Sequence, residues 1–93
     1  MAIRFTAIEL SGGTQHEHIV RLWWVNPANG KTGDNSRAEL VDWIEKENGK
    51  AYVEDRVGHR VDVHVVTPQY GLKYLRTKRD GVWSDNLLAL PRR

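Results

Sequence analysis

Histidine and carboxylate side chains at alternating positions are the residues of this sequence best suited to chemistry. His16 and His18 are two residues apart. Asp62 and His64 repeat that spacing. Residues two apart on a β-strand project from the same face, so neighbouring strands would bring imidazoles and a carboxylate together, and such ligands bind zinc or iron. A metal-dependent enzyme is therefore one hypothesis, although polar residues on the solvated face of a sheet explain the spacing more simply.

No catalytic motif supports that hypothesis, and we assign no catalytic residue, metal ligand or cofactor. The segment 30–33, Gly-Lys-Thr-Gly, contains the Gly-Lys-Thr of phosphate-binding loops but lacks the earlier glycine of such loops. The chain has no cysteine, which excludes disulfides, thiolate metal sites and cysteine nucleophiles. The sequence therefore predicts a protein that is not an enzyme.

Two adjacent tryptophans, Trp23 and Trp24, support a different function. They follow each other on an expected strand, so their rings must lie on opposite faces. One ring is expected to pack beneath the helix against Leu40 or Trp43. Unless the leucine-rich closing segment covers it, the other ring is exposed, and tryptophan is typical of the centre of a protein interface. The leading hypothesis is a binding or adaptor module that contacts another protein, or a second copy of itself, through an aromatic sheet surface.

Basic residues gather in the last third of the chain, although the formal net charge is only +2. The cluster consists of Lys73, Arg76, Lys78 and Arg79. Tyr74 and Trp83 lie near it. Basic residues interleaved with aromatic rings can neutralise a nucleic-acid backbone and stack on its bases. Nucleic-acid binding through this C-terminal hairpin is therefore the alternative function, against the simpler interpretation of a solvated charged face.

The length and composition are those of one small folded domain. The chain has 93 residues with a mixture of apolar and charged types that argues against disorder, so we expect a single domain over residues 1–93. No apolar run is long enough to span a membrane, and the N-terminus does not resemble a signal peptide. We therefore expect a cytoplasmic protein without membrane contact.

Apolar periodicity predicts about five strands and one helix. Strands are expected at 2–10, 16–25, 51–55, 61–66 and 72–78, the last followed by a short return strand at 82–83. On the first strand, Ile3, Phe5 and Ala7 are expected to share one face. Residues 26–35 have the composition of a loop. The resulting order, β-β-α-β-β-β, predicts an α+β domain in which one helix lies across a face of an antiparallel sheet.

Helix boundaries are marked by capping residues. Ser36 followed three residues later by Glu39 is a capping box, in which each side chain satisfies a backbone N–H of the other residue. Asn48-Gly49 ends the helix, with the glycine expected in the left-handed conformation.

The closing segment consists of a hairpin followed by one turn. Asp80-Gly81 is a typical turn between the strands at 72–78 and 82–83. The segment 85–90 is expected to form a single helical turn that brings Leu87 and Leu90 into the core and ends at Pro91.

Four short motifs in this part of the chain carry a resemblance. They are Tyr74-Leu75-Arg76-Thr77, Asp80-Gly81, Asp85-Asn86-Leu87-Leu88 and Leu90-Pro91. Together they resemble the C-terminal hallmark of a family of small bacterial and phage proteins of unknown function. The resemblance implies a small stand-alone domain of bacterial or phage origin, and it brings no catalytic residue, cofactor or substrate.

Overall fold

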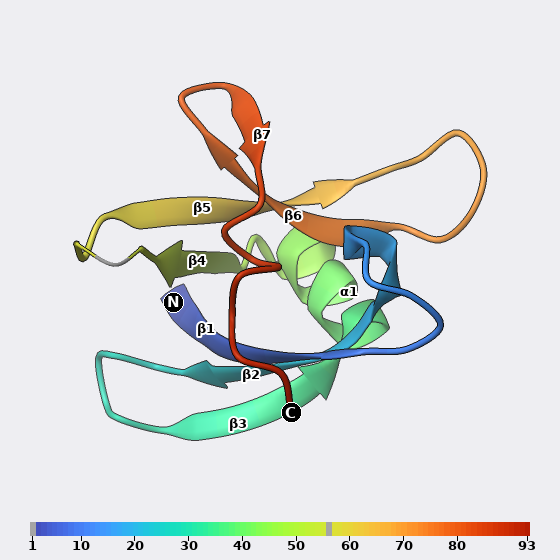
Figure 1. Cartoon of the computed structure of the whole chain (residues 1–93). Coiled ribbons are helices and arrows are strands. Elements are labelled where there is room, and N and C mark those ends of the chain that lie inside the picture. Colours follow the sequence, from blue (N-terminus) through green and yellow to red (C-terminus); the bar gives the residue numbers. More distant parts are fainter. Residues whose placement is uncertain (1, 56) are drawn as a thin grey trace.

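The computed structural model describes residues 2–55 and 57–93, which contain seven strands, one α-helix and one short 3-10 helix. In chain order they are β1 (Ala2–Leu10), η1 (His16–His18), β2 (Ile19–Val25), β3 (Thr32–Ser36), α1 (Arg37–Glu47), β4 (Lys50–Glu54), β5 (Arg60–Val66), β6 (Tyr74–Arg79) and β7 (Val82–Ser84). The strands form one sheet in the order β3-β2-β1-β4-β5-β6-β7 (Figure 1). The α+β class is confirmed, with seven strands rather than five. No helix of the described residues is long and apolar enough to cross a membrane.

The sheet is mixed, so the expectation of a purely antiparallel sheet was wrong for one pair of strands. β1 and β4 run parallel, with Ala2 opposite Lys50 and Arg4 opposite Tyr52. Parallel neighbours require a crossover connection, and the chain between them, which includes α1, supplies it. The other five strand pairs in the described residues are antiparallel.

β3 is the strand that the sequence did not predict, since its residues are polar and include a glycine. It pairs with β2 over its whole length. The indole N–H of Trp24 donates to Asn35 Oδ1 at 2.8 Å, and Gly33 leaves the room that the Trp24 ring occupies. On the opposite face, Arg21 forms an ion pair with Asp34. The strand is therefore stabilised by contacts with β2 that its own composition does not reveal.

A bulge in β1 changes which of its residues reach the core. The pairing with β2 shifts between Phe5 and Ala7, so Thr6 is the additional residue. Ile3 and Phe5 lie in the core as expected, and Ile8 joins them there. Ala7 is also buried, but it pairs with Trp23 and so lies on the other face of the strand. The expected grouping of Ala7 with Ile3 and Phe5 was wrong because strict alternation fails at the bulge.

Helix α1 begins as the sequence predicts. Ser36 Oγ accepts from the Glu39 backbone N–H at 3.3 Å, and Glu39 Oε1 accepts from the Ser36 N–H at 3.0 Å. At the other end, Asn48 rather than Gly49 takes the left-handed conformation, with a φ of 54°. Gly49 is needed for another reason, because a Cβ there would lie 2.3 Å from the Trp43 ring.

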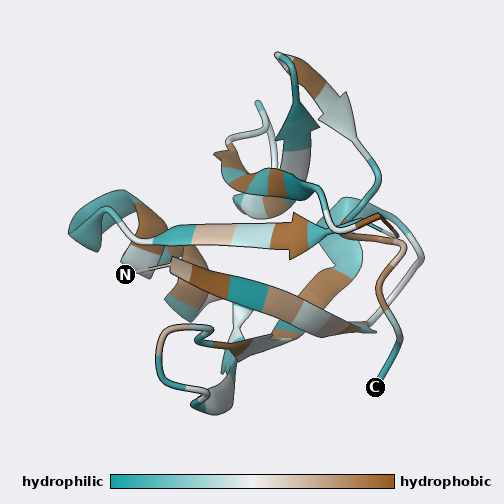
Figure 2. Cartoon of the chain, turned by 90° about the vertical axis from the view of Figure 1, so that its left-hand side faces the viewer, coloured by the Kyte–Doolittle hydropathy of each residue, from teal (hydrophilic) through white to brown (hydrophobic). Residues whose placement is uncertain are grey.

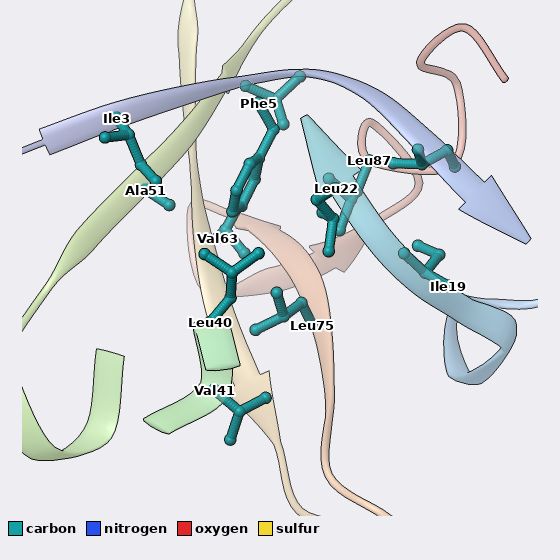
Figure 3. Close-up of a cluster of buried hydrophobic side chains, with 12 residues drawn as sticks. Ile3, Phe5, Ile19, Leu22, Leu40, Val41, Ala51, Val63, Leu75 and Leu87 are labelled. Carbon is teal, nitrogen blue, oxygen red and sulfur yellow. The ribbon is translucent and has the colours of Figure 1, made fainter. Parts of the chain in front are cut away.

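The core lies between the helix and the inner face of the curled sheet. Hydrophobic and hydrophilic residues alternate along the strands (Figure 2). The buried side chains converge from the strands, the helix and the C-terminal segment (Figure 3). They are Ile3, Phe5, Ile8, Ile19, Leu22, Leu40, Val41, Ala51, Val53, Val63, Leu75 and Leu87. We call the face of the sheet that points away from this core and from α1 the outer face.

The C-terminal segment completes the core. After β7 it forms the expected turn, in which the Ala89 N–H donates to the Asp85 carbonyl at 3.2 Å. Leu87 is fully buried. The chain then runs beside β1, where the Ile8 N–H donates to the Pro91 carbonyl and the Arg93 N–H donates to the Ile8 carbonyl, both at 2.9 Å. Figure 1 shows this segment returning from β7 to β1.

Candidate interaction surface

The structure separates the histidines that the metal hypothesis needs. His16 and His18 belong to η1 rather than to the expected strand, and His18 Nδ1 accepts from the Gln15 N–H at 3.1 Å. His64 and Asp62 are exposed on β5. Within residues 2–55 and 57–93, no three histidine, cysteine or acidic side chains are close enough to bind a metal ion. The two pairs were expected to converge only if their strands were neighbours, and β2 and β5 are separated by β1 and β4.

His16 is a buried histidine beside the ion pair of Arg76 and Asp85. It is 5% exposed, and its Nε2 has no hydrogen-bond partner in the described residues. Asp85 Oδ1 lies 3.8 Å from that nitrogen, and the Arg76 guanidinium binds the same carboxylate oxygen at 3.0 Å. Burial, followed by the charge of Arg76, lowers the pKa of His16 against the opposing effects of Asp85 and Glu17. The charged form of His16 is therefore disfavoured where the C-terminal segment begins.

One continuous row of side chains crosses the outer face through all seven strands. In order across the sheet, the row is Thr32, Val25, Arg4, Tyr52, Asp62, Lys78 and Trp83. Each member lies directly opposite its neighbour in the hydrogen-bonding pattern, so the side chains stand side by side on one face. The sheet thus presents cations, rings and a carboxylate together.

Three cations on this face lie against aromatic rings. The Arg60 Cζ atom lies 4.3 Å from the centroid of the Tyr52 ring. The Lys78 Nζ atom lies 4.9 Å from the Trp83 ring. The Arg93 Cζ atom lies 5.1 Å from the Trp23 ring. An aromatic ring attracts a cation without neutralising it, so these cations keep their full charge for a partner.

The two candidate tryptophans lie on opposite faces of β2, as the sequence predicts. Trp24 packs against the core and lines a small pocket with Leu40 and Trp43, which confirms that one ring packs beneath the helix. Trp23 lies on the outer face and lines a groove with Arg93. Both rings are half-buried. Trp83 is 39% exposed and is the more accessible tryptophan, although sequence reasoning treated it only as a neighbour of the basic cluster.

Three of the four cations in the basic cluster of the C-terminal hairpin have carboxylate partners. Lys73 binds Glu45 of α1 at 2.8 Å. Arg76 binds Asp85. Arg79 lies 3.6 Å from Asp55 in the connection between β4 and β5. These three cations therefore have carboxylate partners on three different elements.

Lys78 is the exception in the cluster, because it lies on Trp83 and forms no ion pair within the described residues. Spacing in the sequence could not distinguish the paired cations from Lys78, since the carboxylates that bind Lys73 and Arg79 come from distant parts of the chain.

Comparison with known proteins places the chain in a family. Residues 4–91 match the profile of a protein family of unknown function, DUF3892. The chain belongs to this family. The DUF3892 match covers nearly all of the sequence, so it describes the whole domain rather than a motif. No curated protein and no solved structure matches the chain. The C-terminal hallmark and a bacterial or phage origin stay predictions.

Proposed function

We propose that this DUF3892 protein is a cytoplasmic, non-enzymatic binding module that contacts a partner protein through the outer face of its sheet. The observation that carries the proposal is the arrangement of Trp23, Tyr52 and Trp83 on that face, each with a cation against its ring. Of these rings, Trp83 is 39% exposed and Trp23 is half-buried, so a partner could reach both in part, whereas Tyr52 is buried. Tryptophan, tyrosine and arginine are the residues enriched in interface hot spots.

Mixed charge on the face supports a protein partner. Glu54 binds Arg4 at 3.3 Å, and Asp62 stands between Tyr52 and Lys78 in the row. Carboxylates placed between cations repel a continuous phosphate backbone but suit a protein surface, whose charges alternate in sign. Tyr52 is also a poor platform for base stacking, since it is only 4% exposed beneath Arg60.

Nucleic-acid binding is the second candidate, and one observation favours it. Lys78 lies on the accessible Trp83 and keeps its charge, as a contact to a phosphate beside a stacked base would require. This candidate predicts that binding of a single-stranded oligonucleotide weakens steeply with salt and is lost in Lys78→Gln. Binding that ignores salt would contradict it.

The test of the leading proposal compares two exposed aromatic residues. Trp83→Ala is expected to abolish recovery of the partner from a lysate of the source organism, whereas Tyr70→Ala is expected to leave it unchanged. Tyr70 is 85% exposed and belongs to the connection between β5 and β6, so it is a matched control away from the face. Circular dichroism confirms that both variants fold. Equal recovery with both variants would refute the proposal.

Self-association through the same face is the other form of the proposal. A symmetric pair would bury the outer face of one copy against that of the second. Light scattering over a range of concentrations distinguishes the two forms, because a stable dimer has twice the mass of the monomer. The mass of a dimer should fall to that of the monomer in Trp83→Ala.

A further inference from the structure

A groove lies on the outer face where β1, β2, β3 and the C-terminal residue come together. The groove is open to solvent and has a volume of about 520 Å³, and its lining includes Arg4, Thr6, Trp23, Thr32, Asp34 and Arg93. The two arginines belong to segments at opposite ends of the chain. They are brought to the same groove because the C-terminal segment runs beside β1 at Ile8.

Both arginines of the groove retain unused hydrogen-bond donors. Arg4 binds Glu54 through Nη1 at 3.3 Å, while its Nε is buried and has no hydrogen-bond partner within residues 2–55 and 57–93. A buried donor without a partner is costly, and burial also keeps this Nε away from an incoming ligand. The Arg4 side chain as a whole is 39% exposed, so a ligand would reach Arg4 through its terminal nitrogens. Arg93 rests on the Trp23 ring, and none of the ion pairs among the described residues includes it.

The carboxylates at the groove do not use these donors. Asp34, which lines it, is held by Arg21 of the neighbouring strand. Glu54 reaches Arg4 from β4 but binds Nη1 rather than Nε. The groove therefore has a surplus of positive charge beside an aromatic ring, with two threonine hydroxyls also on its wall.

We infer that this groove binds a carboxylate side chain from an acidic segment of the partner protein, beside an apolar residue placed against Trp23. The inference rests on the proposed function and names the chemistry of its partner. The guanidinium group matches a carboxylate because two parallel N–H donors meet its two oxygens. A polynucleotide fits less well, since Asp34 and Glu54 flank the arginines and would face the phosphates on either side of the bound one.

The experiment uses a capped peptide of alternating glutamate and leucine, and the same peptide with glutamine in place of glutamate. The indole N–H signals of the tryptophans are followed by nuclear magnetic resonance during each titration. We expect the glutamate peptide to shift the Trp23 signal and the glutamine peptide to leave it unchanged. Binding should weaken with added salt, because charges at a surface are screened.

Arginine variants test the geometry. Arg4→Gln and Arg93→Gln should each weaken binding of the glutamate peptide about tenfold, since each removes a charge-assisted hydrogen bond. Arg93→Lys should weaken it too, because lysine keeps the charge but lacks the paired donors. Arg37→Gln is the matched control: it removes the same charge from the start of α1, where Arg37 donates to the Glu17 carbonyl. Thermal unfolding verifies that all four variants are folded.

Four outcomes would overturn the inference. Equal binding of the glutamate and glutamine peptides would show that no carboxylate is recognised. An equal loss in Arg37→Gln would reveal a general charge effect, and a tighter complex with a single-stranded oligonucleotide would assign the groove to phosphate. If neither peptide binds while Trp83→Ala still abolishes recovery of the partner, this inference fails and the proposed function stands.

Discussion

Replacement of Leu87 by alanine tests whether the C-terminal segment is part of the core. Leu87 is fully buried and belongs to the same cluster as Ile8, Leu22 and Leu75. Leucine-to-alanine changes at such sites lower the free energy of unfolding by about 3 to 5 kcal/mol, because the transfer free energy of the removed atoms is lost and a cavity is left behind. A domain of this length has a free energy of unfolding of roughly 5 to 14 kcal/mol. Leu87→Ala should therefore remove a large fraction of the total stability.

The expected change is large enough for a simple measurement. In a domain of this size, each kcal/mol shifts the midpoint of thermal unfolding by roughly 4 to 8 °C, so Leu87→Ala should lower it by roughly 12 °C or more. Circular dichroism during heating and urea unfolding both measure the effect. Leu72→Ala is the matched control, because Leu72 is 73% exposed in the connection between β5 and β6 and should change stability by less than about 0.5 kcal/mol.

The comparison of Leu87→Ala with Leu72→Ala also shows which result would contradict the reasoning. The reasoning is wrong if Leu87→Ala lowers the free energy of unfolding by less than about 1 kcal/mol, or by no more than Leu72→Ala does. Buried leucine-to-alanine changes cost more than that, so such a result would mean that the burial of Leu87 contributes little to stability. In that case, the pairing of the C-terminal residues with β1 would contribute little to stability. The placement of Arg93 beside Trp23, which depends on this pairing, would then lack support.

Three further predictions concern local contacts. Gly49→Ala should lower the free energy of unfolding by about 1 to 3 kcal/mol, measured by urea unfolding, since a Cβ would overlap the Trp43 ring; unchanged stability would contradict that close approach. Trp24→Phe should lower the free energy of unfolding by about 1 kcal/mol in the same assay, because Asn35 Oδ1 loses its donor. The double variant Trp24→Phe and Asn35→Ala should be only a little less stable than Trp24→Phe, because the two residues share one hydrogen bond. Burial lowers the pKa of His16 in the folded protein, so the free energy of unfolding should decline as the pH falls below 6.5, the ordinary pKa of histidine. His16→Gln should flatten this part of the plot of stability against pH. An unchanged slope would mean that other groups cause the decline.

The parts of the fold that follow local rules could be predicted from the sequence. Ser36 and Glu39 start the helix because a capping box needs only two residues three positions apart in the chain. The turn of the last hairpin places Asp80 and Gly81 at φ values of 51° and 80°, which suit the tight turn that Asp-Gly indicates. Leu87 lies in the core as expected. In each case, the deciding interactions are between neighbours in sequence or follow directly from hydrophobicity.

The features of the fold that were predicted wrongly depend on contacts between residues far apart in the sequence. β3 has a loop-like composition and becomes a strand because Trp24 and Arg21 of β2 hold its side chains. Leu72 was expected on a strand, but β6 begins only at Tyr74. The bulge at Thr6 likewise comes from the pairing of β1 with β2 and has no signal in the alternation of residues.

The candidate surface illustrates why residue type alone does not define a binding site. Sequence reasoning grouped Lys78 with Arg79 by proximity, yet Arg79 is paired with Asp55 whereas Lys78 rests on Trp83. An ion pair reduces the charge that a partner meets, while a ring holds a cation in position and leaves its charge intact. The cations held on rings are Lys78 on the C-terminal hairpin, Arg60 at the start of β5 and Arg93 beside β2, so they are spread across the sheet. For the nucleic-acid alternative, this difference leaves Lys78 as the cation of the cluster that has no ion pair within the described residues, whereas the protein contact stays proposed on the aromatic sheet surface that the sequence predicted.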